Sequence, residues 1–220
     1  MSGRQRYYVD GKRVPGVTTI TGNLGWSKEP LMHWANRMGL AGTELRDARK
    51  GPAQTGTIAH AAIEAEIKGE EIDLSGLEDA QRNTVDTILV RWLAWKAEHV
   101  NEVLLSEAPL TSATLKYGGR LDMVFRGKDG KAWLCDVKTG GIYPEGLVQV
   151  AGYAMLVEEQ TNLVDGSTYK IDTLALLRIP QDSDSITTME RPWNPESVEA
   201  KTFRLCRELH DIYWQLKREV

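Results

Sequence analysis

The spacing of apolar residues changes along the chain from a helical period to an alternating one and back again. Between residues 28 and 100, apolar residues recur every three or four positions, which predicts helices at Leu31–Gly39, 52–68 and Leu77–His99. Between about 102 and 191, short runs rich in Val, Leu, Ile and aromatic residues are separated by turn residues, which predicts strands. A last helical pattern follows Pro195.

The strand region predicts a mixed sheet. We expect strands at Glu102–Thr111, Gly119–Arg126, Lys131–Thr139, Ile171–Ile179 and Ser185–Arg191. The first three read as an antiparallel meander, and a helix at Glu145–Glu158 then crosses over so that the fourth strand returns to the sheet. The predicted fold class is therefore α+β, with helices on both sides of a central sheet.

Both ends of the chain add further elements. Arg6–Val14 predicts a hairpin turned by Asp10-Gly11. In the last helix we expect the apolar face to dock on the rest of the protein; that face consists of Val198, Phe203, Leu205, Leu209, Ile212, Tyr213 and Leu216. One domain over residues 1–220 is predicted, with a helical region at about 28–100, the sheet at about 102–191 and the final helix at about 195–219.

Composition limits where any polyanion could bind. The 220 residues carry a net charge of −4 with a pI of about 5.7, so no global basic field points to nucleic acid. Basic residues do gather before residue 60 and around residue 120, where they could follow phosphates. They are Arg4, Arg6, Lys12, Arg13, Arg46, Arg49, Lys50, Lys116 and Arg120.

Cysteine content and hydropathy predict the compartment. Cys135 lies in an apolar strand and Cys206 in the last helix, which predicts a reducing environment without a disulfide framework. No apolar run is long enough to span a bilayer, and the N-terminus lacks an apolar signal core. We expect a soluble cytoplasmic protein of a bacterium or a phage-infected host, with no membrane partner.

Two acids and a lysine lie on one predicted hairpin, and its register decides whether they meet. A two-residue Asp129-Gly130 turn would send Asp136 to the face opposite Asp122. A three-residue loop from Lys128, with Gly130 in the left-handed conformation, would set Asp122 directly opposite Asp136. We predict the second register, in which Lys138 shares the face of Asp136.

This register brings two carboxylates together beside an ammonium. Directly opposite acids have Cβ atoms about 4.5–5.5 Å apart and repel one another unless a cation lies between them. Oxygen ligands of this kind favour Mg²⁺ or Mn²⁺, which can polarise a phosphoryl group and lower the pKa of a bound water. Lys138 could then orient or deprotonate that water, or stabilise charge on the phosphate. The alternative is a surface hairpin with one solvated Asp–Lys pair.

Two predicted helices carry polar pairs four residues apart, which places each pair on one helix face. His60 and Glu64 form the first pair, and an imidazole is a good ligand for Mn²⁺. Gln149 and Tyr153 form the second. The alternative is that His60 is solvated and that both helices are ordinary amphipathic helices.

Four motifs follow one another in the chain. They are G-x-x-x-H (Gly56 to His60), G-x-x-D (Gly119 to Asp122), D-x-K (Asp136 to Lys138) and Q-x-x-x-Y (Gln149 to Tyr153). In this order they resemble the RecB-like branch of the PD-(D/E)XK nuclease superfamily. The segment RYYVDGKRVPGVTTITGNLG further resembles the phage and mitochondrial exonucleases of that branch, although Gly16 stands where their Pro-Ser-Val-Thr-Thr pattern has Ser.

The resemblance implies a restriction-endonuclease-like core and a role for each motif residue. His60, Asp122, Asp136 and the backbone carbonyl of Val137 would bind metal, and Asp122, Asp136, Lys138, Gln149 and Tyr153 would be catalytic. Glu64 and Glu107 would bind the metal directly or through water, or have only a structural role. Arg120, Lys116 and Thr139 are the expected DNA contacts.

The implied activity is metal-dependent hydrolysis of DNA by an exonuclease serving phage or bacterial recombination, replication or repair. Mg²⁺ or Mn²⁺ is the implied cofactor. Some RecB-like nucleases carry a four-cysteine iron–sulfur cluster, which two cysteines cannot supply, so none is predicted. Expected partners are DNA and recombination or replication proteins. An endonuclease or structure-specific nuclease on the same site, or a DNA-binding module that does not cleave, are the alternatives.

Overall fold

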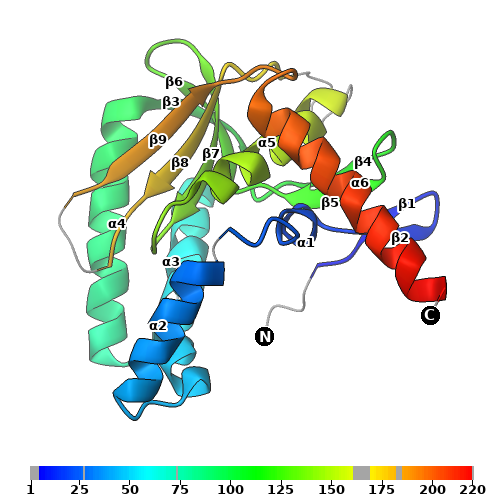
Figure 1. Ribbon diagram of the computed structural model, residues 1–220. Helices are drawn as coiled ribbons and strands as arrows, with labels where there is room; N and C mark the ends of the chain where they lie inside the picture. Colours follow the sequence, from blue (N-terminus) through cyan, green and yellow to red (C-terminus); the bar gives the residue numbers. More distant parts are fainter. Residues whose placement is uncertain (1–4, 27, 73, 161–168, 182–184, 220) are drawn as a thin grey trace.

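Most of the strand-forming runs assemble into one central sheet, as a computed structural model of the chain shows (Figure 1). The structure describes residues 5–26, 28–72, 74–160, 169–181 and 185–219, and the side chains of residues 47–54 are not described within these ranges. Arg4 and the side chains of Arg49 and Lys50, which we predicted to flank the motifs, thus lie outside the described part.

The central sheet has five strands in the order β3-β6-β7-β8-β9. Their bounds are β3 Val100–Ser106, β6 Met123–Gly127, β7 Ala132–Lys138, β8 Thr173–Arg178 and β9 Thr187–Pro192. All neighbours pair antiparallel except β7 and β8, which run parallel and are joined across the sheet by helix α5 (Pro144–Glu159). The predicted α+β class with a central mixed sheet is confirmed.

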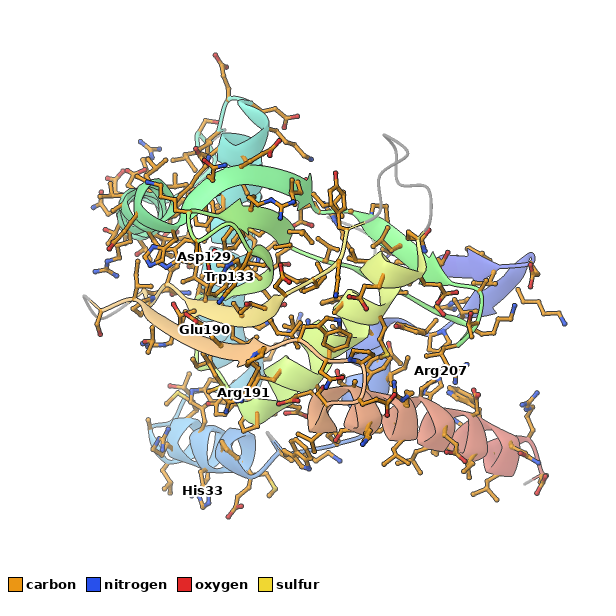
Figure 2. The ribbon with its side chains drawn as sticks, turned by 90° about the horizontal axis from the view of Figure 1, so that it is seen from above. His33, Asp129, Trp133, Glu190, Arg191 and Arg207 are labelled. Atoms are coloured by element: carbon orange, nitrogen blue, oxygen red, sulfur yellow. The ribbon has the colours of Figure 1, made fainter. Side chains whose placement is uncertain are left out.

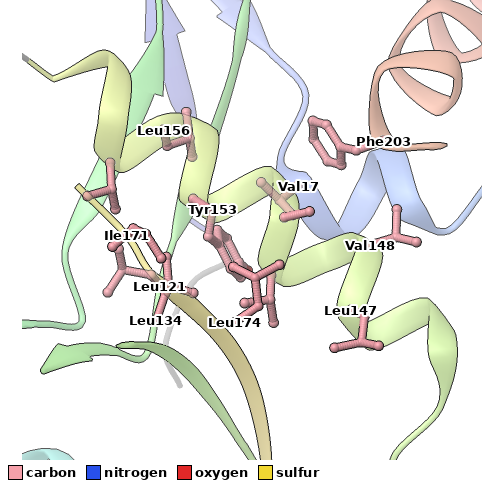
Figure 3. Close-up of a cluster of buried hydrophobic side chains, with 14 of the residues drawn as sticks. Val17, Leu121, Leu134, Leu147, Val148, Tyr153, Leu156, Ile171, Leu174 and Phe203 are labelled. Carbon is pink, nitrogen blue, oxygen red and sulfur yellow. The ribbon is translucent and has the colours of Figure 1, made fainter. Parts of the chain in front are cut away.

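Alternation along β7 sends its side chains into two separate cores. Leu134 packs with α5 and with Phe203 of helix α6 (Val198–Glu219), in the core drawn in Figure 3. Cys135 and Val137 face the opposite side, where Trp92 is fully buried. Helices therefore cover both faces, which fixes the register of the strand because a shift by one residue would exchange the two sets.

The second face is covered by α3 (Leu45–Lys68) and α4 (Asp79–His99), and α2 (Lys28–Leu40) precedes them. α4 begins with reciprocal hydrogen bonds between the side chains and backbone of Glu78 and Gln81, which satisfy its first N–H groups. α3 ends at Gly69, whose φ of 69° closes the last turn. The three predicted helices are confirmed, with α3 beginning at Leu45 rather than at 52.

Two short antiparallel pairs lie outside the central sheet. β1 (Tyr7–Val9) and β2 (Lys12–Val14) form the predicted N-terminal hairpin, with Asp10 and Gly11 both at positive φ, and α1 (Val17–Thr21) follows. β4 (Pro109–Ser112) pairs with β5 (Tyr117–Arg120). The predicted strands Glu102–Thr111 and Gly119–Arg126 are wrong as single strands, since each is interrupted, at residues 107–108 and 121–122 respectively.

The apolar face of the last helix also differs from the prediction. Phe203 is buried, with its ring 4.9 Å from that of Tyr117, and it decides which side of α6 docks. The remaining residues of the predicted docking face are exposed: Val198, Leu205, Leu209, Ile212, Tyr213 and Leu216. The C-terminal half of α6 runs on past α5 towards the β1–β2 hairpin (Figure 1).

None of the helices within the described ranges combines the length and the apolar composition that a membrane span requires.

Candidate functional site

The hairpin between β6 and β7 has the predicted register. Met123 pairs with Cys135 and Val124 with Leu134, which is the three-residue-loop alternative. Gly130 has φ +81°, the left-handed conformation that this loop requires. Asp122 lies one residue before the first of these pairs, so its position depends on more than the regular ladder.

A bend in the sheet sets the position of Asp122. The pairing of β3 with β6 and that of β4 with β5 continue one register, and Glu107 and Asp122 stand opposite each other between them. The N–H of Glu107 donates to the Asp122 carbonyl at 2.8 Å, and Glu107 adopts φ +49°, which is uncommon for a residue with a side chain. The Asp122 carboxylate turns towards β7, where its Oδ2 accepts the N–H of Val137 at 2.7 Å.

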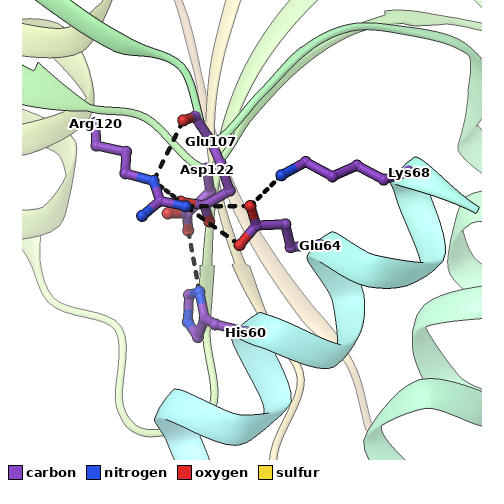
Figure 4. A network of polar contacts seen from close by, with 6 residues as sticks. All are labelled: His60, Glu64, Lys68, Glu107, Arg120 and Asp122. Carbon is purple, nitrogen blue, oxygen red and sulfur yellow. Dashed lines mark hydrogen bonds and ion pairs between the residues drawn. The ribbon is translucent and has the colours of Figure 1, made fainter. Parts of the chain in front are cut away.

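Three ligand-type side chains converge at this bend. One ligand atom each of His60, Glu107 and Asp122 lies within 4.8 Å of the others. His60 Nδ1, from α3, is 3.6 Å from Asp122 Oδ2 (Figure 4). The set brings together a nitrogen donor and carboxylate oxygens from two different parts of the fold.

Asp136 and its neighbours form the other side of the site. Asp136 is buried in β7, its Oδ2 lies 2.6 Å from Lys138 Nζ, and that oxygen accepts no well-oriented hydrogen bond from any described residue. Its Oδ1 accepts a hydrogen bond from Gln149 Nε2 at 3.2 Å, and the same nitrogen lies 3.2 Å from the Tyr153 hydroxyl. The D-x-K and Q-x-x-x-Y motifs therefore meet although they come from different elements.

A second layer of charges surrounds the bend (Figure 4). Arg120 Nε is 2.5 Å from Glu107 Oε2, and Arg120 Nη2 is 3.1 Å from Glu64 Oε1. Glu64 also pairs with Lys68 on the same helix. The structure thus places Glu64 and Arg120 in an ion-pair network that holds Glu107.

The crowding of acids shifts their protonation. Burial, followed by repulsion from Asp122, raises the pKa of Glu107 to about 7. Burial and then the charge of Asp136 raise the pKa of Asp122 to about 6, although His60 and Lys138 act against this. For Lys138, burial lowers the pKa, but the carboxylates of Asp136 and Asp122 outweigh it and the net shift is upwards. The site is rich in negative charge that a bound cation would stabilise.

The charged groups open onto a cleft of about 500 Å³. His60, Glu107, Asp122 and Lys138 form part of its wall, and the wall also includes Thr139 and Gly56. A Cβ at Gly56 would lie 2.9 Å from Thr139 Oγ1, so the first glycine of G-x-x-x-H lets α3 approach the end of β7.

Gly119, the first residue of G-x-x-D, has a similar role. A Cβ there would lie 2.5 Å from the ring of Tyr153, which is buried against β5. The glycine therefore allows α5 to bring Tyr153 and Gln149 up to the site. Close packing explains two motif positions that carry no chemistry of their own.

The predicted DNA contacts fall in three different surroundings. Thr139 lines the cleft. Arg120 is engaged with Glu64 and Glu107, and Lys116 pairs with Asp10 at 2.8 Å outside the cleft. Sequence reasoning missed the direct opposition of Glu107 to Asp122 and the role of Arg120 as the counter-charge, since both depend on the bend.

The donor set fits a divalent metal ion. Two carboxylates and an imidazole suit Mg²⁺ or Mn²⁺, and Asp136 adds a buried oxygen without a well-oriented hydrogen bond. His60, Glu107 and Asp122 would hold an ion at the bend, with Asp136 beside it. Burial and then repulsion between neighbouring acids raise the pKa of Glu107 and of Asp122, and a bound cation would favour their ionised forms.

Comparison with known proteins gives one informative result. No curated protein matches the chain. Among solved structures, it is similar to the crystal structure of SSO0001, with a TM-score of 0.34 and 16% identity over 70% of each chain, a likeness too weak to define the fold. The family profile of the PD-(D/E)XK nuclease superfamily, by contrast, matches residues 31–216, which includes all four motifs and most of α6. The chain belongs to the PD-(D/E)XK nuclease superfamily.

Proposed function

We propose that this nuclease is a DNA exonuclease of the RecB-like branch that uses Mg²⁺ or Mn²⁺ and serves phage or bacterial recombination, replication or repair. The branch is proposed from the four motifs and their order in the chain. The single observation that carries the chemistry is that His60, Asp122 and Lys138 line one cleft, with the buried Asp136 Oδ2 2.6 Å from Lys138 Nζ.

The proposed roles follow from the contacts of each side chain. Asp122 and Asp136 bind metal together with His60 and the carbonyl of Val137, and Glu107 joins them at the bend. A divalent ion bound there supplies Lewis-acid activation of the phosphate and of an attacking water. The Asp122 carboxylate is held by the N–H of Val137, so its orientation is set before substrate arrives.

Lys138 is the residue proposed to stabilise the negative charge that develops during cleavage. Its ammonium is next to Asp136 and reaches the cleft, where it can donate to the attacking water or to a phosphate oxygen as negative charge develops. Gln149 holds Asp136 through Oδ1 and is itself next to the Tyr153 hydroxyl. We propose that these two residues position the acid and the lysine rather than contact the scissile bond.

The test is cleavage of end-labelled single- and double-stranded linear DNA, with Mg²⁺, with Mn²⁺ and with EDTA. We expect stepwise products, no activity in EDTA, and Mn²⁺ at least as effective as Mg²⁺ because His60 offers a nitrogen ligand. Asp136→Asn keeps the shape of the buried side chain and should abolish cleavage. Asp129→Asn, at the other end of the same hairpin, is the matched control and should leave cleavage unchanged.

Two outcomes would replace the proposal. Cleavage of closed circular DNA as fast as of linear DNA would make the protein an endonuclease. Tight DNA binding with no cleavage under either metal would make it a binding module, which the presence of both acids and the lysine argues against.

A further inference from the structure

A groove larger than the cleft lies on another part of the surface. It has a volume of about 1260 Å³ and runs between the β1–β2 hairpin and the C-terminal half of α6. Arg207 of α6 donates to the carbonyls of Leu115 and Lys116, which ties the helix to the turn between β4 and β5 (Figure 2). Lys116 in turn pairs with Asp10 at the tip of the hairpin, so both walls are fixed to the same turn.

The groove is basic although the chain as a whole is acidic. Seven of its lining residues are Lys or Arg and two are Asp, whereas the chain has 27 basic and 31 acidic residues. Arg120, Lys116 and Arg207 are paired with acids. The other four lining cations form no ion pair with any described acid: Arg6, Lys12, Arg13 and Arg218. A local positive field of this kind favours a polyanion.

An aromatic side chain stands in the same groove. Trp214 lines the groove and is 45% exposed, although tryptophan, a large side chain, is mostly buried in folded proteins. Lys217 Nζ lies 4.8 Å from the centre of its ring. A basic groove with an accessible aromatic platform is the arrangement that binds single-stranded nucleic acid, because phosphates follow the cations and unpaired bases stack on the ring.

The inner end of the groove meets the candidate site. Arg120 and Tyr153 line the groove, while Arg120 is paired with Glu107 and Tyr153 is next to Gln149. Glu107 also lines the cleft that contains Lys138. A strand lying in the groove would therefore lead directly to the acids.

We propose that the groove between the β1–β2 hairpin and α6 binds a single-stranded DNA segment adjoining the phosphodiester in the cleft. This inference rests on the proposed nuclease function and deepens it by naming the strand state of the DNA next to the site. Arg6 and Arg13 contact phosphates, and Trp214 stacks on a base.

The first test measures binding alone, so that it does not depend on turnover. Fluorescence anisotropy with labelled oligothymidylate of about 20 nucleotides, in EDTA, gives the affinity as a function of salt. We expect Arg6→Gln/Arg13→Gln to weaken binding roughly tenfold and to reduce the salt slope by about 1.4, since each phosphate contact on a single strand contributes about 0.7. The matched control is Lys131→Gln/Lys170→Gln, two exposed lysines that do not line the groove.

The second test asks whether bases stack. Trp214→Ala should weaken binding about fivefold or more. Trp26→Ala is the matched control, because Trp26 is the same residue type, is 53% exposed and does not line the groove. Duplex DNA of the same length should bind more weakly than the single strand and should respond little to Trp214→Ala.

The outcomes separate this inference from the proposed function. Unchanged affinity and salt slope in the arginine double variant would overturn the groove assignment, even if Asp136→Asn still abolished cleavage. Equal binding of duplex and single strand, or equal effects of Trp214→Ala and Trp26→Ala, would overturn the single-strand assignment. Normal groove binding together with no cleavage under any metal would instead overturn the nuclease proposal and leave the groove assignment standing.

Discussion

The end of β7 and the bend at Glu107 and Asp122 bring charges to the same cleft by different means. β7 is a regular strand, and alternation alone puts Asp136 and Lys138 on one side of it. The bend is irregular, and its geometry depends on a left-handed Glu107 and on partners from α3. The strand supplies the acid–ammonium pair, and the bend supplies Glu107 and Asp122, which His60 of α3 joins.

This difference indicates how the two regions divide the work. A group held by a regular strand and packed on both sides can be placed with little freedom, which suits a residue that acts in the transition state. A bend that brings the carboxylates of Glu107 and Asp122 together is electrostatically costly without a cation, which suits a metal-binding position. The following predictions test that division, beginning with the largest effect.

Lys138→Gln and Arg120→Gln compare two cations: Lys138 at the end of β7, and Arg120, which pairs with Glu107 of the bend. We expect Lys138→Gln to reduce turnover on linear DNA by about 10²–10³-fold, the usual cost of losing one preorganised donor. Arg120 is 39% exposed and is paired with Glu107 and Glu64 rather than with Asp136, so its loss should cost about fivefold or less. Single-turnover cleavage measures both. Equal losses would mean that Arg120 also acts on the reacting phosphate.

His60→Ala tests whether the bend binds metal. Titration calorimetry with Mn²⁺ should show affinity weaker by at least tenfold, since even outer-shell partners of metal ligands cost about 10–100-fold. His33→Ala is the control, because His33 is an exposed histidine of α2 (Figure 2) and does not line the cleft. Unchanged Mn²⁺ affinity in His60→Ala would remove the imidazole from the ligand set.

The same comparison explains what the sequence could predict. The hairpin register was predicted from a three-residue loop that ends at a left-handed Gly130, and the structure has this register, because turn chemistry is a local signal. The positions of Asp136 and Lys138 followed from that register. Gly56 and Gly119 were identified by their motifs, and the structure adds the packing reason.

The bend and the docking of α6 could not be predicted in this way. Nothing in the spacing around Glu107 signals a positive φ, since the residue is held there by a backbone hydrogen bond to Asp122, 15 residues away in the chain. The docked face of α6 is chosen by Phe203, which packs on Tyr117 and over Gly152. Both features depend on contacts between segments distant in the sequence, and the periodicity of the sequence does not report such contacts.

Gly119→Ala tests how tightly β5 is packed on α5. The added methyl group would overlap the ring of Tyr153, and overpacking of this kind costs about 1–3 kcal/mol in the free energy of unfolding. Gly39→Ala is the control, since no atom lies near that position on α2 and alanine is the better helix former. Chemical denaturation should show Gly119→Ala destabilised and Gly39→Ala equal to or above the parent.

Glu107→Gln tests the electrostatic cost of the bend through its pH dependence. The folded-state pKa of Glu107 is raised from 4.5 to about 7, first by burial and then by Asp122. Between these two values the folded protein keeps a proton that the unfolded chain has released. Stability therefore falls as pH rises through this window and remains lower above it. Asp122, whose pKa is raised from 3.8 to about 6, acts in the same direction at slightly lower pH.

Removing the ionisable group at residue 107 should remove its part of that loss. In EDTA we expect Glu107→Gln to match the parent at pH 5 and to melt a few degrees higher at pH 8, where each kcal/mol corresponds to about 2–4 °C for a protein of this size. Adding Mn²⁺ at pH 8 should stabilise the parent more than the variant, because the parent offers the ion one more carboxylate. Thermal unfolding followed by circular dichroism at both pH values measures the difference. A variant that melts below the parent at pH 8 in EDTA would show that the pairing of Glu107 with Arg120 outweighs its repulsion from Asp122, and the bend would then be stable without metal.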